Sequence, residues 1–252
     1  MKATTVKMLS LAFGMCLAAC SHNTGFKKAS PEVTATTQMQ LALEYLQLGQ
    51  LANARDNIER ALIENPANPD VQMTAGLVYE RLNEKSKAEH AYATGYRLGK
   101  GNPNIGNTYA GYLCRTGKTA AGEKLFDEVA RSPLYQTPEV ALVNAGVCVR
   151  GTGDLVDAER YFNRALAIRP NLPEAMLQLG NIAIDRGDAV QARDTVLRYL
   201  AVNPPTAEVL WLGFRAERKL GDATAAAGYA RRVQVEFPNS DQAQMMRSGI
   251  DR

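Results

Sequence analysis

A three-point pattern that recurs every 34 residues constrains this 252-residue chain more than any other feature. Each copy has a turn glycine, a small residue early in a second helical pattern, and a proline that ends the unit. The copies are Gly153, Ala158 and Pro170; Gly187, Ala192 and Pro204; and Gly221, Ala226 and Pro238. A period kept over three copies predicts stacked units, because each unit buries its apolar face against its neighbours.

Paired helical halves within a 34-residue period are typical of tetratricopeptide (TPR) repeats. The pattern predicts an all-α fold, a right-handed superhelix of about six repeats. Their expected ranges are 35–68, 69–102, 103–138, 139–172, 173–206 and 207–240, followed by a C-terminal cap at 241–252. Gly117 precedes Gly153 by 36 residues, so we expect two extra residues near positions 131–133, where a connecting loop is easiest to lengthen.

Residues 1–19 have the character of a lipoprotein signal peptide rather than of a folded element. Lys2 and Lys7 supply positive charge, and the apolar stretch at 8–17 is too short to span a bilayer. The following L-A-A-C at 17–20 resembles a bacterial lipobox, in which Cys20 becomes the first residue and carries acyl chains. The alternative is an ordinary cleavage site beside a cysteine.

A lipidated Cys20 would hold the protein on a membrane, because anchoring becomes stable once more than one acyl chain inserts. Residues 20–34 are polar and without helical periodicity, which predicts a flexible tether. Ser21 stands where Asp would indicate inner-membrane retention in Gram-negative lipoproteins. The expected location is therefore the periplasmic face of the outer membrane. Apart from this covalent lipid, the sequence predicts no cofactor.

The charge balance gives no case for nucleic-acid binding. The chain has 29 basic and 26 acidic side chains, and removal of residues 1–19 leaves 27 against 26.

No catalytic or metal-binding constellation is recognisable. The two histidines, His22 and His90, lack partners at metal-ligand spacing. Gly111 with Gly117, Lys118 and Thr119 resembles a phosphate-binding loop, but it has one intervening residue too many and no preceding strand pattern. The sequence thus predicts a protein that binds rather than catalyses.

Apolar residues gather on the expected inner face of the first two repeats. By helical spacing the inward side chains there are Met39, Leu43, Leu46, Met73 and Leu77, and Asn107 and Gly111 follow in the third repeat. They suit a groove for an apolar peptide or strand, although core packing between helices would explain them equally well. Chaperone-binding TPR domains instead clamp a carboxylate with Lys, Arg and Asn at matching positions, so that function is disfavoured. Trp211, Arg215 and Arg218 form a second candidate contact face, or a capping face.

Cys114 and Cys148 remain after signal-peptide removal and lipidation, and both lie near the ends of first helices in neighbouring repeats. In an oxidising compartment a disulfide between them is sterically feasible. From its loop length it would stabilise the fold by about 4 kcal/mol at most. Two buried free thiols are the alternative.

These features together resemble the type IV pilus biogenesis and stability lipoprotein family, called PilF or PilW. The resemblance rests on the lipobox, the six repeats and two segments: N-T-Y-A-G-Y-L-C-R-T-G-K at 107–118 and N-A-G-V-C-V-R-G-T-G-D at 144–154. Ala110 and Gly111 depart from the family's usual order of small residues, and Tyr112 stands where the family has phenylalanine.

The resemblance implies an outer-membrane pilotin that promotes localisation and multimerisation of the pilus secretin. It also implies a disulfide between Cys114 and Cys148. The implied partners are the secretin and the outer membrane, through the lipid anchor, with other pilus assembly proteins as further candidates. Two alternatives stay open: a TPR lipoprotein scaffold for another envelope machine, such as peptidoglycan synthesis enzymes, and a lipoprotein that activates a synthase.

Overall fold

The computed structural model of the chain describes residues 29–249. The expected signal peptide, Cys20, the first part of the tether and the last three residues therefore lie outside the described residues. The described part folds into thirteen helices and no strand. The helices are α1 (Pro31–Gln47), α2 (Leu51–Glu64), α3 (Pro69–Arg81), α4 (Lys85–Leu98), α5 (Pro103–Arg115), α6 (Thr119–Arg131), α7 (Pro138–Arg150), α8 (Leu155–Ile168), α9 (Pro173–Asp185), α10 (Ala189–Val202), α11 (Ala207–Leu220), α12 (Ala223–Glu236) and α13 (Asp241–Arg247).

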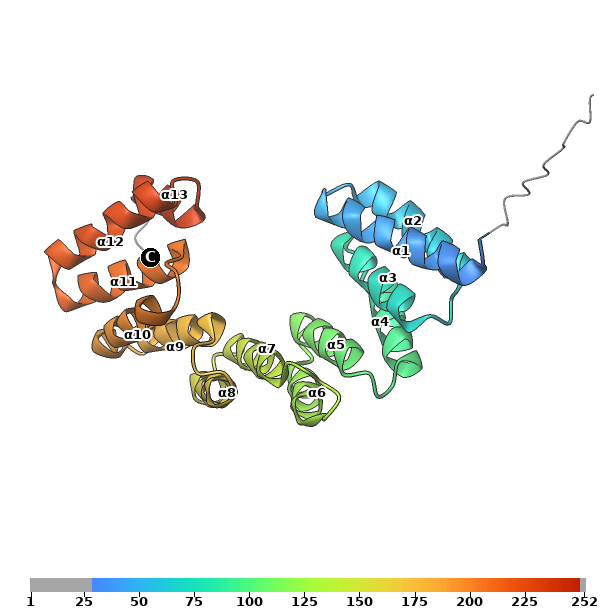
Figure 1. Cartoon of the computed structure of the whole chain (residues 1–252), viewed down its shortest axis with the longest axis horizontal. Coiled ribbons are helices and arrows are strands. Elements are labelled where there is room, and N and C mark those ends of the chain that lie inside the picture. Colours follow the sequence, from blue (N-terminus) through green and yellow to red (C-terminus); the bar gives the residue numbers. More distant parts are fainter. Residues whose placement is uncertain (1–28, 250–252) are drawn as a thin grey trace, which may run out of the picture.

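Six helix pairs follow one another along an arch, and α13 ends it (Figure 1). The first helices α5 and α7 lie on the inner side of this arch, whereas α6 and α8 lie on its outer side. The all-α TPR superhelix predicted from the period is therefore confirmed. None of the described helices is both long and apolar enough to cross a membrane.

The turn and start signals of the sequence explain the helix boundaries. Gly153 joins α7 to α8 with φ of 88°, a left-handed conformation that glycine adopts without steric cost. Asn83 takes the equivalent place between α3 and α4 with φ of 59°. At the next unit, Asn68 Oδ1 accepts a hydrogen bond from the Asp70 amide at 2.8 Å and Pro69 occupies the first helical position.

The first helix begins four residues earlier than expected. We predicted a tether through residue 34, but α1 starts at Pro31, and Ser30 Oγ accepts a hydrogen bond from the Val33 amide at 3.3 Å. Ser30, Pro31 and Glu32 together form an N-terminal helix signal of cap, proline and acidic first turn. The prediction placed the start of the unit at Ala35, which is its first buried residue, and therefore overlooked the exposed first turn of α1.

The longest connection between two repeats falls where the two extra residues were expected. Residues 132–137 join α6 to α7, six residues where the other connections between repeats have four. Tyr135 in this connection is buried and packs into the central core cluster. The connection is therefore longer but still attached to the fold.

Close packing within three of the pairs, α3–α4, α7–α8 and α11–α12, depends on a glycine opposite an aromatic ring. A Cβ added to Gly146 on α7 would lie 2.6 Å from Phe162 on α8. The same contact occurs between Gly76 and Tyr92, at 2.7 Å. Since side chains in protein cores leave no such space, these helices can approach only because the glycines lack a side chain.

Candidate binding groove

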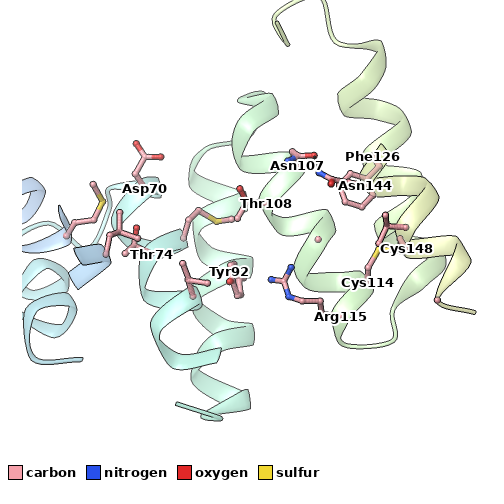
Figure 2. A pocket seen from close by; sticks show the side chains of 17 residues that line it. Asp70, Thr74, Tyr92, Asn107, Thr108, Cys114, Arg115, Phe126, Asn144 and Cys148 are labelled. Atoms are coloured by element: carbon pink, nitrogen blue, oxygen red, sulfur yellow. Dashed lines mark hydrogen bonds between the residues drawn. A yellow bond between two sulfur atoms is a disulfide. The ribbon is translucent and has the colours of Figure 1, made fainter. Parts of the chain in front are cut away.

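A groove of about 820 Å³ runs along the inner face of repeats 1 to 4. Its lining comes from the first helices α1, α3, α5 and α7, with Tyr92 and Phe126 contributed from second helices. The lining residues are Met39, Leu43, Asp70, Met73, Thr74, Leu77, Tyr92, Asn107, Thr108, Gly111, Cys114, Arg115, Phe126, Asn144, Val147, Cys148 and Gly151. Figure 2 shows this part of the inner face from close by.

The N-terminal end of the groove is apolar. Met39 and Leu43 come from α1, and Met73 and Leu77 come from α3, so four of the five side chains expected to face inward in repeats 1 and 2 line one hollow. Met73 is 7% exposed and also packs against α4, where a Cβ added to Gly95 would lie 2.7 Å from its sulfur atom. It therefore belongs both to the core and to the groove wall.

Leu46 is the exception among the predicted groove residues. It is 6% exposed and belongs to the core cluster of the first repeats with Ala42 and Ile58, so it does not line the groove. Leu46 lies in the last turn of α1, where the side chain faces the neighbouring helices of the core. The prediction was wrong because helical spacing shows which residues share a face of a helix. It does not show which of them pack against neighbouring helices and which face the groove.

Two amide side chains lie in the half of the groove that α5 and α7 form. Asn144 Nδ2 on α7 donates a hydrogen bond of 3.1 Å to Asn107 Oδ1 on α5. Both side chains are half-buried and both line the groove (Figure 2). Gly111 lies one turn after Asn107 on α5, where an added Cβ would meet a single atom, Arg115 Nη1 at 3.2 Å. The floor of the groove is therefore bare helix backbone at this point.

A disulfide between Cys114 and Cys148 forms part of the groove wall. It joins α5 to α7, and the two Cα atoms are 5.5 Å apart, as two adjacent first helices allow. The pair bridges the same two repeats that the long 132–137 connection joins. The Cys114–Cys148 disulfide expected from the sequence is thus present in the structure.

Of the described residues that line the groove, Asp70 and Arg115 are charged. Arg115 donates from Nε and Nη2 to the Glu80 carboxylate at 2.7 and 3.0 Å, and Tyr92 Oη donates to the same carboxylate at 2.9 Å. Burial raises the pKa of Glu80, but the hydrogen bonds from Arg115 and Tyr92 outweigh it and hold this pKa below its ordinary value. Burial and the neighbouring Glu80 raise the pKa of Tyr92. The groove is thus close to neutral.

The second candidate face lies at the other end of the arch. Trp211 and Phe214 pack with ring centroids 5.2 Å apart, and the guanidinium of Arg218 lies 5.5 Å from the Phe214 ring. Arg215 donates to Asn181 Oδ1 on α9 at 3.4 Å. These side chains contact their own helix and α9, so they contribute to packing of the last repeats.

The other sequence motifs have structural roles in the described residues. The phosphate-loop-like segment places Gly111 on a helix and Gly117 in a turn with φ of 80°, and the Lys118 ammonium pairs with the Glu89 carboxylate. Within residues 29–249, no three side chains of His, Cys, Asp and Glu gather as a metal site would require.

Sequence reasoning missed Asn144 and Val147. Val147 on α7 is 47% exposed and lines the groove at a position 36 residues after Gly111. Correcting the period for the two-residue insertion would have found it, because Gly111 and Val147 then occupy equivalent positions.

Relatives in pilus assembly match nearly the whole chain. The type IV pilus assembly protein PilF of Pseudomonas aeruginosa is 22% identical over 239 residues, 95% of each protein. The crystal structure of PilW, described as a widely conserved type IV pilus biogenesis factor, has 29% identity and a TM-score of 0.71, covering 84% of this chain and 97% of that one. The solved Pseudomonas aeruginosa PilF structure has 22% identity and a TM-score of 0.67, covering 88% and 100%. The resemblance to PilF and PilW predicted from the sequence is therefore confirmed.

Two family models, both described as tetratricopeptide repeat, match the chain. One matches residues 39–103 and 112–173, about half of the chain, and the other matches 150–212. With the paired helices, the 34-residue period and these matches, the chain belongs to the tetratricopeptide repeat family.

Proposed function

We propose that this protein is a non-catalytic scaffold of type IV pilus biogenesis, a pilotin that promotes outer-membrane localisation and multimerisation of the pilus secretin. The observation that carries the proposal is the neutral, apolar groove on the inner face of repeats 1 to 4. Similarity to PilF and PilW over most of the chain supports the assignment to pilus assembly.

The chemistry of the groove favours protein binding. Met39, Leu43 and Leu77 are partly buried side chains that a partner segment can cover. Burial of apolar surface stabilises a complex by about 25 cal/mol for each Å² removed from water. Methionine and leucine also adapt their rotamers to a bound chain, which suits helix-lined recognition.

The proposed anchor explains why binding would promote assembly. Lipidated Cys20 would hold each copy at the periplasmic face of the outer membrane, and residues before α1 would tether the arch. A secretin subunit bound in the groove would then be confined near other subunits, which raises their effective concentration.

The proposal is tested by placing charge in the groove. Leu43→Glu and Leu77→Glu each put a carboxylate where a partner would bury apolar surface, so each should weaken binding to the purified secretin by tenfold or more. Leu197→Glu is the matched control, because Leu197 lies on α10 and is 54% exposed outside the groove. Binding is measured by calorimetry and helicity by circular dichroism.

If the Leu43→Glu and Leu77→Glu proteins keep their helicity and bind the secretin with unchanged affinity, the groove is not the secretin-binding site. Absence of secretin binding by the unaltered protein, together with binding to a peptidoglycan synthase, would favour the alternative of another envelope machine.

A further inference from the structure

The inner face of the arch changes from apolar to charged toward its last repeats. Leu43 and Leu77, which line the groove, each hold the ninth position of their repeat. In repeats 5 and 6 the same position holds Asn181 on α9 and Arg215 on α11. Equivalent positions of stacked repeats face the same side, so these two side chains continue the inner surface toward the end of the arch that lies away from α1 (Figure 1).

Two guanidinium groups share one carboxylate on this surface. Arg150 on α7 donates from Nη2 to Asp185 Oδ2 at 2.6 Å and from Nη1 to Gln178 Oε1 at 2.8 Å. Arg215 Nη2 lies 4.0 Å from Asp185 Oδ1, and Arg215 Nη1 donates to Asn181 Oδ1 at 3.4 Å. An ordinary N–H···O hydrogen bond is about 2.9 Å long, so Arg150 is held firmly and Arg215 is held loosely. The cluster therefore has two positive charges and one negative charge.

Arg215 is placed to receive a carboxylate from outside the chain. Its side chain is 27% exposed, and its guanidinium is a planar fork of N–H donors that matches the two oxygens of a carboxylate. Trp211 lies one turn earlier on the same face of α11 and is half-buried, with its ring against Phe214. A half-buried indole beside a cation offers apolar surface next to positive charge.

We propose that Trp211 and Arg215 form a second protein-binding surface, which takes a segment with an acidic residue beside an apolar one. The carboxylate of the partner pairs with Arg215 and supplies the negative charge that the cluster lacks. The apolar side chain next to it covers the exposed part of the Trp211 ring. Charge complementarity thus favours an acidic segment here, whereas the groove favours an apolar one.

This surface goes beyond the proposed function and does not depend on it. The groove lining extends along the chain as far as Gly151, whereas Trp211 and Arg215 lie on α11. One partner bound at the groove and another at α11 would meet on the same arch, so the protein could hold two chains together.

Asp185 provides a variant that should strengthen binding. Asp185→Asn keeps an oxygen that can accept a hydrogen bond from Arg150 but removes the charge that competes with a partner for Arg215. A purely structural role of Asp185 would predict unchanged or weaker binding instead. Arg215→Gln removes the charge of the surface, and Arg231→Gln is its matched control, because Arg231 is exposed on the second helix α12.

The probe is a library of random twelve-residue peptides, selected against the mature protein in detergent. Selection uses a protein that carries both Leu43→Glu and Leu77→Glu, which excludes ligands of the apolar groove. We expect enriched peptides in which Asp or Glu stands next to an aromatic or aliphatic residue. Affinities are then measured by calorimetry on proteins with an unaltered groove, and helicity is checked by circular dichroism.

The affinity of these peptides should fall about tenfold in Arg215→Gln and in Trp211→Ala, and should not change in Arg231→Gln. It should rise about threefold in Asp185→Asn, since one competing carboxylate is removed. An increase of NaCl from about 0.05 M to about 0.5 M should weaken binding about fivefold, because the contact is an exposed ion pair.

Three results would overturn the proposal. The first is enrichment of peptides without acidic residues, and the second is unchanged affinity in helical Arg215→Gln or Asp185→Asn protein. The third is binding of the protein to phosphatidylglycerol vesicles, or self-association in sedimentation, that Arg215→Gln abolishes, because the occupant would then be a lipid surface or a second copy. If acidic peptides bind as expected but the secretin does not bind the groove, the proposed function is wrong and this surface stands.

Discussion

Glycines on the first helices have different structural roles, which depend on the side chains that surround them. Gly146 faces the ring of Phe162 within the α7–α8 pair, whereas Gly111 faces the open groove. Both lie on the middle of a first helix, where glycine costs helix stability relative to alanine. The packed glycine is required by its neighbour, but the groove glycine is not.

Alanine at these two positions should change stability in opposite directions. Gly146→Ala brings Cβ to 2.6 Å from the buried Phe162 ring and should destabilise the fold by about 1–3 kcal/mol. In Gly111→Ala the new Cβ meets only the flexible end of Arg115, so this variant should stabilise the fold by about 1 kcal/mol at most. Chemical denaturation of both variants measures the difference, and equal effects would contradict the distinction.

At the residue scale the sequence predicted part of the site. Met39, Leu43, Met73 and Leu77 line the groove as expected from helical spacing, but Leu46 belongs to the core. Asn144 escaped notice because its role depends on Asn107, a residue 37 positions away on another helix. Spacing predicts a shared helix face, whereas contacts between helices depend on packing that spacing alone does not give.

At the scale of elements, the joint between repeats 3 and 4 combines a long connection with a covalent link. The six-residue 132–137 connection joins α6 to α7, and the Cys114–Cys148 disulfide joins α5 to α7. The units of a repeat array contact only their neighbours, so each junction between repeats holds the arch together by its own contacts. The disulfide adds a covalent link at the junction with the longest connection.

Replacement of both cysteines by serine should lower the free energy of unfolding by about 4 kcal/mol at most. The estimate follows from closing a loop with a sequence separation of 34 in the unfolded chain. Urea denaturation with and without dithiothreitol measures it. Dithiothreitol should destabilise the unaltered protein and leave the stability of the double serine variant unchanged. An equal loss of stability in both proteins would show that reduction of this disulfide is not the cause.

Glu80 couples three helices in a way that depends on pH. It lies on α3 and accepts hydrogen bonds from Arg115 on α5 and Tyr92 on α4. Its folded pKa lies below the ordinary value of 4.5, so its contribution to stability is present above that value and is lost as pH falls through the folded pKa. The carboxylate is partly exposed, so the contribution is about 1 kcal/mol at most.

The Glu80→Gln variant should therefore lose less stability than the unaltered protein between pH 7 and pH 3. Thermal unfolding at a series of pH values measures the two slopes. Lys85→Gln, an exposed change at the start of α4, controls for an altered charge. Identical slopes for Glu80→Gln and the unaltered protein would show that the pKa of this carboxyl group does not differ between the folded and unfolded states.

Helix boundaries were easier to predict than the site, because their signals are local. Proline at helix starts and glycine at turns placed most pairs, and the two-residue insertion followed from the spacing of Gly117 and Gly153. Ser30 and Pro31 carried an equally local signal for the start of α1, but the repeat register obscured it.

At the scale of the whole molecule, the proposed function separates binding from anchoring. The groove lies in repeats 1 to 4, whereas the proposed lipid on Cys20 lies beyond the start of α1 and outside the described residues. Cys20→Ala should therefore release the protein from the membrane without altering the groove. The purified variant should bind secretin with unchanged affinity, whereas Leu43→Glu should stay on the membrane and bind weakly.

In cells the two variants should produce the same defect for different reasons. Under the proposed function, loss of the anchor would remove the confinement of the secretin to the outer membrane and the gain in effective concentration, so multimers and twitching motility should be lost. Membrane fractionation and secretin multimer assays on both variants check this. Normal outer-membrane multimers in the Cys20→Ala strain would reject the anchor as the cause of assembly. Restoration of multimers by a different outer-membrane anchor fused to the Cys20→Ala chain would establish that attachment itself, rather than the lipid, is required.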